Sequence, residues 1–288
     1  MVRNRTKSRI ALCIAIGFFA AAGILAYVYF TMTDKANPEP SPGVEQSVSA
    51  ENPFVEVDWE YWKSINPDVI GWVNVSDTPI NYPILQAHAD DPEFYLHHDV
   101  YKEWSLYGVP YLDASNETYG LLDSLNAVVF GHHMNDGTMF AAFANYSDKS
   151  FADAHKNIYV QTPDKQVVYE AQCVQIIDGT TLSKRTSFVD PTDYETWYQE
   201  QINNAVVTLG SSDIPESLIT FCTCSYNRFS NERTLVLASP ERIWWQSAES
   251  KLVESTTSQP NQYLEYQESD SSLSEQTPTL NNSLNSEE

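Results

Sequence analysis

Residues 218–237 read LITFCTCSYNRFSNERTLVL. An apolar run leads into two cysteines, a more polar segment follows, and Arg233 stands just before a second apolar run. Short apolar runs bounded by turn-forming residues are typical of buried β-strands. We therefore predict that Cys224 ends one strand and that Arg233 begins the next. Two of the chain's four cysteines at one strand end call for a chemical or structural reason.

Similar apolar runs recur through the middle of the chain and indicate a mainly β fold. Eight short strands with turn signals between them predict a closed eight-stranded barrel. The expected strands are 68–75, 80–86, 108–113, 127–133, 157–162, 166–177, 217–224 and 233–239.

Two helices accompany the predicted strands. Residues 57–66 have amphipathic spacing and precede Pro67, which predicts a short helix at the start of the domain. Residues 190–207 predict a second helix, before the strand with the cysteine pair, capped by Thr192 or Asp193. Its apolar face should cover the barrel and contains Tyr194, Trp197, Tyr198, Ile202 and Val206.

The two ends of the chain differ in composition from the predicted domain. Residues 1–9 are basic, and residues 10–32 form an uncharged apolar run, about the length that spans a bilayer as a helix. The basic side should remain cytoplasmic, which places the rest of the chain outside the cell. A cleaved signal peptide is the alternative, although the apolar run exceeds the usual signal core. Residues 33–53 are predicted as an extracellular linker, 54–245 as the folded domain and 246–288 as an acidic, polar, disordered tail.

The strongly negative charge of the chain restricts its partners. The formal net charge is -23 and the pI is near 4.4. Such a surface repels the phosphates of DNA and RNA, so we expect no nucleic-acid partner.

Three interpretations of the cysteine pair differ in what they require. Side chains at i and i+2 share a strand face, so Cys222 and Cys224 have Cα atoms about 6.6 Å apart, a poor geometry for a mutual disulfide. Cys173 pairing with either one stays open in an oxidising exterior. His132 and His133 would complete the ligand number of a zinc site, but adjacent residues on a strand face opposite ways. We therefore expect no metal and no cofactor.

A nucleophilic cysteine is the third interpretation. A thiol attacks as thiolate and needs a base or cation nearby, and the oxyanion formed on a carbonyl needs a donor. A histidine at one strand end, a cysteine at another and Arg233 on a third could meet at one rim of the barrel.

Several motifs in order along the chain resemble one known family. They are INPDVIGWVNV (65–75), INYPILQ (80–86), FYLHHDV (94–100), FGHHMNDGTMF (130–140), TFCTC (220–224) followed by Arg233, and the late helix. The chain resembles a class B sortase, whose strand motif is T-L-x-T-C and whose catalytic histidine follows a glycine, here Gly131. Phe221 departs from the usual leucine and should still point into the core.

The resemblance implies a membrane-anchored cysteine transpeptidase on a sortase-type barrel. It would cleave a C-terminal sorting signal of secreted proteins and transfer the acyl group to an amine of a peptidoglycan precursor or a pilin. Cys224 would be the nucleophile and His132 the general acid and base. Arg233 would stabilise the oxyanion or hold the substrate backbone. Thr220 and Thr223 of the same motif are expected to contact substrate.

Alternatives from other functional classes remain at this stage. The barrel could be a membrane-tethered binding or scaffold protein, or a hydrolytic cysteine peptidase. Cys222 is interpreted as an inert residue, with a redox partner as the alternative, and His133 as a structural neighbour of His132. A structural or surface role is also expected for His97, His98 and His155, and the acidic run 88–93 is interpreted as a solvated loop, with weak cation binding as the alternative.

Overall fold

The computed structural model describes residues 52–181, 184–210, 213–225 and 231–247. The predicted basic N-terminus and anchor lie outside the described residues, as do nearly all of the linker and tail. Within the described residues, no helix has the length and apolar character needed to cross a membrane.

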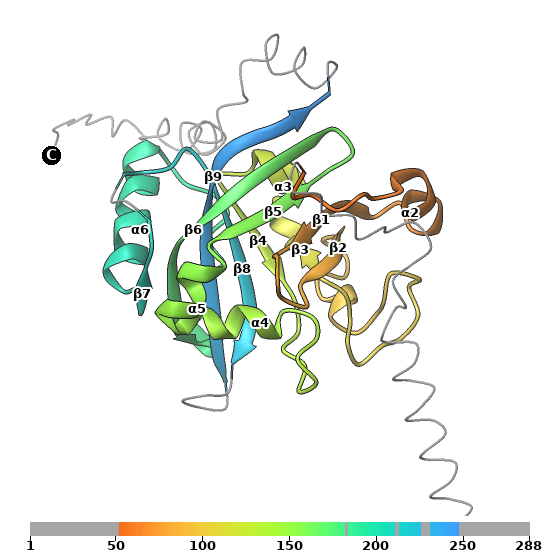
Figure 1. The fold of residues 1–288 in the computed structure, drawn as a ribbon, viewed down its shortest axis with the longest axis horizontal. Helices are drawn as coiled ribbons and strands as arrows, with labels where there is room; N and C mark the ends of the chain where they lie inside the picture. The colour runs from red at the N-terminus through yellow and green to blue at the C-terminus, as the bar shows by residue number, and fades with distance from the viewer. Residues whose placement is uncertain (1–51, 182–183, 211–212, 226–230, 248–288) are drawn as a thin grey trace, which may run out of the picture.

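A closed β-barrel forms the centre of the described chain (Figure 1). Its strands pair in the order β5-β1-β2-β3-β4-β8-β9-β6, and pairing of β5 with β6 closes the ring. The predicted mainly β, closed eight-stranded barrel is confirmed. A short strand that the sequence did not predict, β7, is added to β6. The strands are β1 (Val69–Asn74), β2 (Asn81–Gln86), β3 (Tyr111–Leu112), β4 (Asn126–Phe130), β5 (Asn157–Gln161), β6 (Lys165–Asp178), β7 (Val207–Thr208), β8 (Leu218–Ser225) and β9 (Glu232–Gln246).

Three strands differ in length from their predictions. β3 does not begin at residue 108, because Gly108 has a φ of +57°, outside the extended region. β4 ends at Phe130, before the two histidines. β9 continues past Pro240, which pairs with Tyr169 where the β6–β9 register shifts. A proline is tolerated at such an irregularity because the ladder is already interrupted there.

Alternating side chains of the strands fill the barrel. Phe221 is fully buried in this core, together with Val129 and Val236, its partners on β4 and β9. Its ring stacks on Phe143 at 4.8 Å between centroids and meets Phe140 edge-on at 6.0 Å. The expected inward orientation of Phe221 is therefore confirmed, and the neighbouring residues of β8 face the outside of the barrel.

Helices cover the barrel from several sides (Figure 1). The predicted first helix is confirmed as α2, where Asp58 caps the N-terminus by accepting a hydrogen bond from the Tyr61 N–H. Short elements follow between the strands: η1 (Phe94–Leu96), η2 (Ala114–Asn116), α3 (Gly120–Asp123), α4 (Ala141–Ala144), η3 (Asn145–Ser147), α5 (Lys149–Ala154) and η4 (Gly179–Thr181); α2 covers Trp59–Ile65 and α6 covers Pro191–Asn203.

The late helix α6 packs on the outer face of the barrel beside β7 (Figure 1). Tyr194 and Tyr198 are buried there in a cluster with residues of β6, β8 and β9, as predicted. The cap is Asp190 instead of Thr192 or Asp193, since its carboxylate accepts from the Asp193 N–H and Pro191 fills the first helical position. Val206 does not join the apolar face, because the helix ends at Asn203 and Val206 is exposed.

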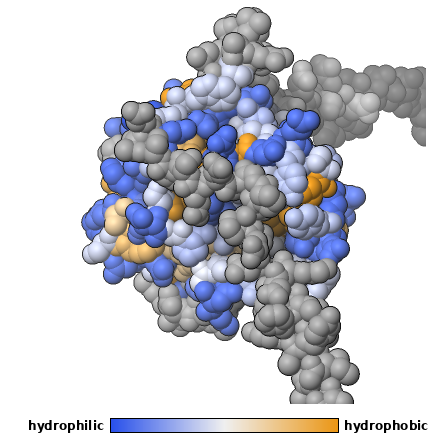
Figure 2. Space-filling view, turned by 45° about the vertical axis from the view of Figure 1, so that its right-hand side comes forward, coloured by the Kyte–Doolittle hydropathy of each residue, from blue (hydrophilic) through white to orange (hydrophobic). Residues whose placement is uncertain are grey.

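Exposed apolar side chains are few on the face seen in Figure 2, which is mostly hydrophilic with scattered hydrophobic residues. In the described chain as a whole, large exposed apolar residues occur mainly in the loop around Trp104 and Leu106 and at the end of β9, at residues 243–245. Singly exposed apolar residues are normal on soluble domains.

Candidate active site

Strand pairing places Arg233 opposite Cys224. β8 and β9 are antiparallel, and these two residues are direct cross-strand partners near the end of β8 and the start of β9. Partners in such a pair project from the same face, with Cβ atoms about 4.5–5.5 Å apart. Both side chains are partly buried. The predicted nucleophile and the predicted guanidinium therefore lie side by side at one rim of the barrel.

His132 reaches the same rim from β4. This strand runs parallel to β8 with Phe130 opposite Cys222, and the Gly131 N–H donates to the Cys222 carbonyl at 3.1 Å. β4 ends at Phe130, so His132 follows two residues beyond the strand, at the end of the barrel where the parallel strand β8 also ends. Burial is the main cause that lowers the pKa of His132, and the positive charge of Arg233 lowers it further, so His132 is within electrostatic range of Arg233. The structure therefore pairs Cys224 with Arg233 and places His132 after the neighbouring strand, and the catalytic roles of the three residues stay a prediction.

His133 takes a separate role beside the nucleophile. One of its ring nitrogens, Nδ1, lies 2.8 Å from the backbone carbonyl oxygen of Cys224. Because a carbonyl only accepts, Nδ1 is the donor in this hydrogen bond. His133 therefore ties the chain after β4 to the end of β8, in agreement with its predicted structural role.

The imidazole of His132 is held by a main-chain oxygen. Its Nε2 lies 2.8 Å from the carbonyl oxygen of Leu96, so Nε2 carries the proton and Nδ1 of the neutral ring is an acceptor. Burial lowers the pKa of His132 because it disfavours the charged form, and the hydrogen bond to Leu96 opposes that shift. The electrostatic effects of His97 and Arg233 lower the pKa further, so the environment favours the neutral ring.

A turn fixes the backbone of His132. The Gly137 N–H donates to the Met134 carbonyl, and Gly137 has a φ of +85°, which suits glycine. The chain then folds back, and the Phe140 N–H donates to the His132 carbonyl at 2.8 Å. The NDG sequence at 135–137 thus forms the turn that reverses the chain. At Gly131 an added Cβ would lie 2.5 Å from the Phe140 ring, which explains the glycine before His132.

The guanidinium of Arg233 lies against the connection after β6. An added Cβ at Gly179 would lie 3.1 Å from Arg233 Cζ, so only a residue without a side chain fits there easily. Arg233 Nη1 donates to the Glu232 carbonyl at 3.1 Å. The planar group is thus partly oriented by the main chain while it remains half-buried at the rim.

A sortase domain model matches residues 73–241 of the chain. The chain belongs to the sortase family. Sortase B of Listeria monocytogenes is 32% identical over 181 residues, covering 61% of this chain and 70% of that relative. Sortase B of Staphylococcus aureus is 28% identical over 228 residues, covering 78% and 91%. The X-ray structure of Clostridium perfringens sortase B matches with a TM-score of 0.58 and 30% identity, covering 64% and 99%. The protein is thus a class B sortase, a cysteine transpeptidase.

The other two described cysteines of this sortase are buried thiols. Burial raises the pKa of both Cys173 and Cys222 to about 12, so neither forms a thiolate near neutral pH. Both lie in the apolar cluster under α6, and all three described cysteines are unpaired. The disulfide that the sequence left open for Cys173 is therefore not formed, and Cys222 has the inert environment that was predicted for it.

The two threonines of the sortase motif are turned away from solvent. Thr220 and Thr223 are 5% and 1% exposed, and the Thr220 hydroxyl donates to Asn126 Oδ1 at 2.7 Å. A buried side chain offers no surface to a substrate. The substrate contacts of Thr220 and Thr223 stay a prediction, although both side chains are buried in this structure.

The remaining histidines contact neighbouring main chain or each other. His98 stacks on Phe94, and His155 Nδ1 lies 3.1 Å from the Ser76 carbonyl oxygen, as expected for structural residues. His97 is exposed but lies closer to the site than predicted, with its ring centroid 6.2 Å from that of His132.

The acidic run 88–93 begins with a paired residue. His88 lies 2.8 Å from Glu117 and 3.3 Å from Asp68, so an ion-pair cluster holds the start of this loop. Within the described part of the chain, no group of three or more potential ligands could hold a metal.

Sequence reasoning missed Lys184, which lies close to the site. Its ammonium group pairs with the buried Asp113 at 2.9 Å and sits 5.1 Å from the centre of the Phe130 ring. Its charge lowers the pKa of Cys222 against the larger effect of burial. An available signal was the adjacent basic pair Lys184-Arg185 in a strongly acidic chain.

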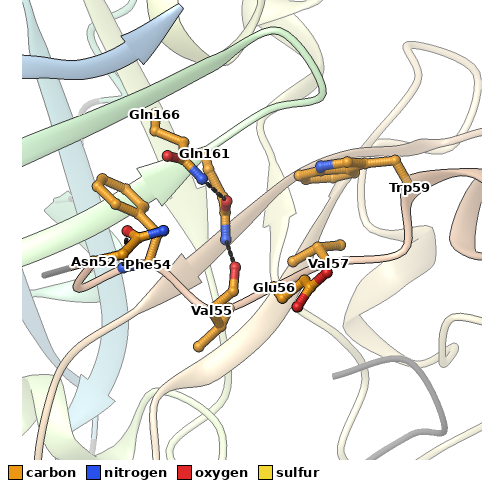
Figure 3. A pocket seen from close by; sticks show the side chains of 8 residues that line it. All are labelled: Asn52, Phe54, Val55, Glu56, Val57, Trp59, Gln161 and Gln166. Carbon is orange, nitrogen blue, oxygen red and sulfur yellow. Dashed lines mark hydrogen bonds between the residues drawn. The ribbon is translucent and has the colours of Figure 1, made fainter. Parts of the chain in front are cut away.

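A pocket of about 350 Å³ lies away from the candidate catalytic residues. Figure 3 shows Gln161 crossing it to donate to the Val55 carbonyl, while Gln166 donates to Gln161. These hydrogen bonds join the N-terminal segment to β5 and β6. The pocket is lined by Asn52, Phe54, Val55, Glu56, Val57, Trp59, Gln161 and Gln166.

Proposed function

We propose that this sortase is anchored in the cell membrane and joins secreted proteins to an amine outside the cell. Its substrate would be a C-terminal sorting signal, and the acceptor an amine of a peptidoglycan precursor or a pilin lysine. The observation that supports the proposal is the pairing of Cys224 with Arg233 across β8 and β9, beside the end of the parallel strand β4 that leads to His132.

The first half of the reaction forms a thioester on Cys224. The Cys224 thiol gives its proton to His132, and the thiolate adds to the carbonyl carbon of the scissile peptide bond. Arg233 donates to the resulting oxyanion, for which its fixed fork of N–H groups is suited. When the C–N bond breaks, His132 returns the proton to the leaving amine.

The second half reverses these proton transfers with a new amine. The entering amine attacks the thioester carbonyl and loses a proton to His132, and the tetrahedral adduct expels Cys224 as thiolate. The proton on His132 then restores the thiol. A new amide joins the sorted protein to the acceptor, and the enzyme returns to its starting state.

The proposed anchor is the apolar segment 10–32, oriented by the basic residues before it. It would hold the domain beside the membrane on the extracellular side, where secreted substrates emerge. Removal of residues 1–32 should release the protein from the membrane fraction. A mature protein whose measured mass lacks those residues would favour a cleaved signal peptide instead.

Substitution of the two neighbouring cysteines tests the proposed chemistry. The full-length protein is incubated with sorting peptides and candidate amines, and thioester and products are followed by mass spectrometry. Cys224→Ala should abolish both, while the matched variant Cys222→Ala should keep both. An inactive Cys222→Ala variant together with an active Cys224→Ala variant would show that the nucleophile was assigned wrongly. Free acid as the sole product despite added amine would indicate a hydrolytic peptidase, and absence of a selectively reactive cysteine would indicate a binding protein.

A further inference from the structure

The hydrogen-bond acceptor for His132 Nε2 belongs to a segment that is distant in sequence from β4, β8 and β9. Leu96 precedes His132 by 36 residues and contributes a main-chain carbonyl at 2.8 Å. A carboxylate is the common partner of a catalytic histidine, because it fixes the ring and its tautomer. In this protein a neutral carbonyl occupies that position, at the end of η1.

The carbonyl of Leu96 is held by close packing against a glycine. Gly108 has a φ of +57°, and a Cβ at this position would lie 2.5 Å from the Tyr95 carbonyl oxygen and 2.6 Å from that of Leu96. Only glycine satisfies both conditions, since it lacks Cβ and adopts positive φ without strain. The Val109 N–H donates to the Tyr95 carbonyl at 3.0 Å, which keeps the two segments together.

The side chain of Tyr95 anchors the same segment to the barrel. Tyr95 is 1% exposed, and its hydroxyl donates to the Asp68 carboxylate and accepts from Asn66 Nδ2 at 3.0 Å. Asn66 and Asp68 precede β1 directly. Contacts on both sides of η1 therefore fix the carbonyl that His132 uses.

We propose that the Leu96 carbonyl, held in place by Gly108, positions His132 in the Nε2–H tautomer and makes Nδ1 the nitrogen that exchanges protons. This inference rests on the proposed function, in which His132 is the general acid and base. Nδ1 takes the thiol proton of Cys224, and the resulting imidazolium keeps its Nε2–H bond to Leu96. Nδ1 then gives the proton to the leaving amine, so Leu96 itself gains and loses nothing.

Substitution of Gly108 tests the positioning role. Gly108→Ala should displace the carbonyl, and we expect kcat to fall by about 10²-fold, the loss typical of a displacement near 1 Å. KM for the sorting peptide should change little, because no substrate contact is removed. The matched control is Gly120→Ala, which also has positive φ, +76°, but would place its Cβ with nothing within 4 Å. Unchanged kcat in a folded Gly108→Ala protein would overturn the proposal.

Nitrogen NMR of the full-length protein reads the tautomer of His132 without requiring that Gly108→Ala folds. With ¹⁵N-histidine labelling, and with His132→Gln to assign the signal, the wild type should show protonated Nε2 and unprotonated Nδ1 at neutral pH. A protonated Nδ1 in the neutral wild-type ring would overturn the proposal. A fully active His132→Gln variant would instead refute the proposed function, so the two failures are distinguishable.

Discussion

Arg233 gives two separable predictions, because its charge and its geometry act on different groups. Arg233 is the cross-strand partner of Cys224, and its fork of donors is proposed to bind the oxyanion. Its charge also lowers the pKa of His132. Arg233→Lys keeps the charge but loses the planar fork, whereas Arg233→Gln loses both. Comparing the two variants therefore separates donor geometry from electrostatics.

The expected loss follows from the value of a single oxyanion donor. Such a donor contributes about 10²–10³ in kcat, or about 2.7–4 kcal/mol, so both variants should be slowed by at least that factor. Their pH profiles should differ. In Arg233→Gln the pKa of His132 rises because a nearby positive charge is gone, and the limb of the profile set by His132 moves to higher pH. In Arg233→Lys that limb should remain almost where it was.

The assay is peptide cleavage with saturating amine, measured across pH. Arg242→Lys is the matched control, since Arg242 is an exposed arginine further along β9 that stacks on Trp244. It should behave as wild type. Near-normal turnover of Arg233→Lys would remove the donor role, and a limb that moves to lower pH in Arg233→Gln would refute the electrostatic argument.

Two further predictions concern stability. Phe221→Ala removes a fully buried ring stacked on Phe143 and should lower the free energy of unfolding by about 3–5 kcal/mol. The melting temperature in a calorimetric scan should fall by about 6–20 °C. Phe221→Leu should lower the melting temperature less, and an equal decrease for both variants would contradict the packing argument. Hydrogen bonds to Glu117 and then to Asp68 raise the pKa of His88 in the folded protein. The protonated form of His88 therefore stabilises the fold. This stabilisation is complete below the unfolded pKa of about 6.5 and disappears as the pH rises through the higher folded pKa. The free energy of unfolding in urea should therefore differ more between wild type and His88→Gln at pH 5.5 than at pH 9. A difference that does not change with pH would refute the pairing.

Strands were predictable where the sequence pattern is local. The apolar runs that became β1, β2, β5 and β8 are bounded by turn residues, and their observed ends lie within one or two residues of the expected ones. The strand ends that were predicted wrongly are set by tertiary contacts. Gly108 takes positive φ because it packs on the carbonyls of η1, and β9 passes Pro240 because β6 supplies a partner strand with an irregular register.

The candidate site was predictable to the extent that its chemistry lies in side chains. Cys224, His132 and Arg233 carry groups whose combination indicates acyl transfer, and short motifs surround each one. The carbonyl of Leu96 could not be found in this way, because every residue has one and only the fold decides which carbonyl meets an imidazole. Thr220 and Thr223 show a second limit, because the motif alone does not indicate that both polar side chains are buried.

The topology of the sheet explains how three residues that are distant in sequence can belong to one proposed site. β8 lies between a parallel neighbour, β4, and an antiparallel neighbour, β9, so the end of β8 coincides with the end of β4 and with the start of β9. A functional group at each of these three ends must share one rim. Because side chains alternate along a strand, a shift of β9 by one residue would turn Arg233 to the opposite face. The core contacts of β9 with Phe221 and its neighbours therefore secure the register on which the chemistry depends.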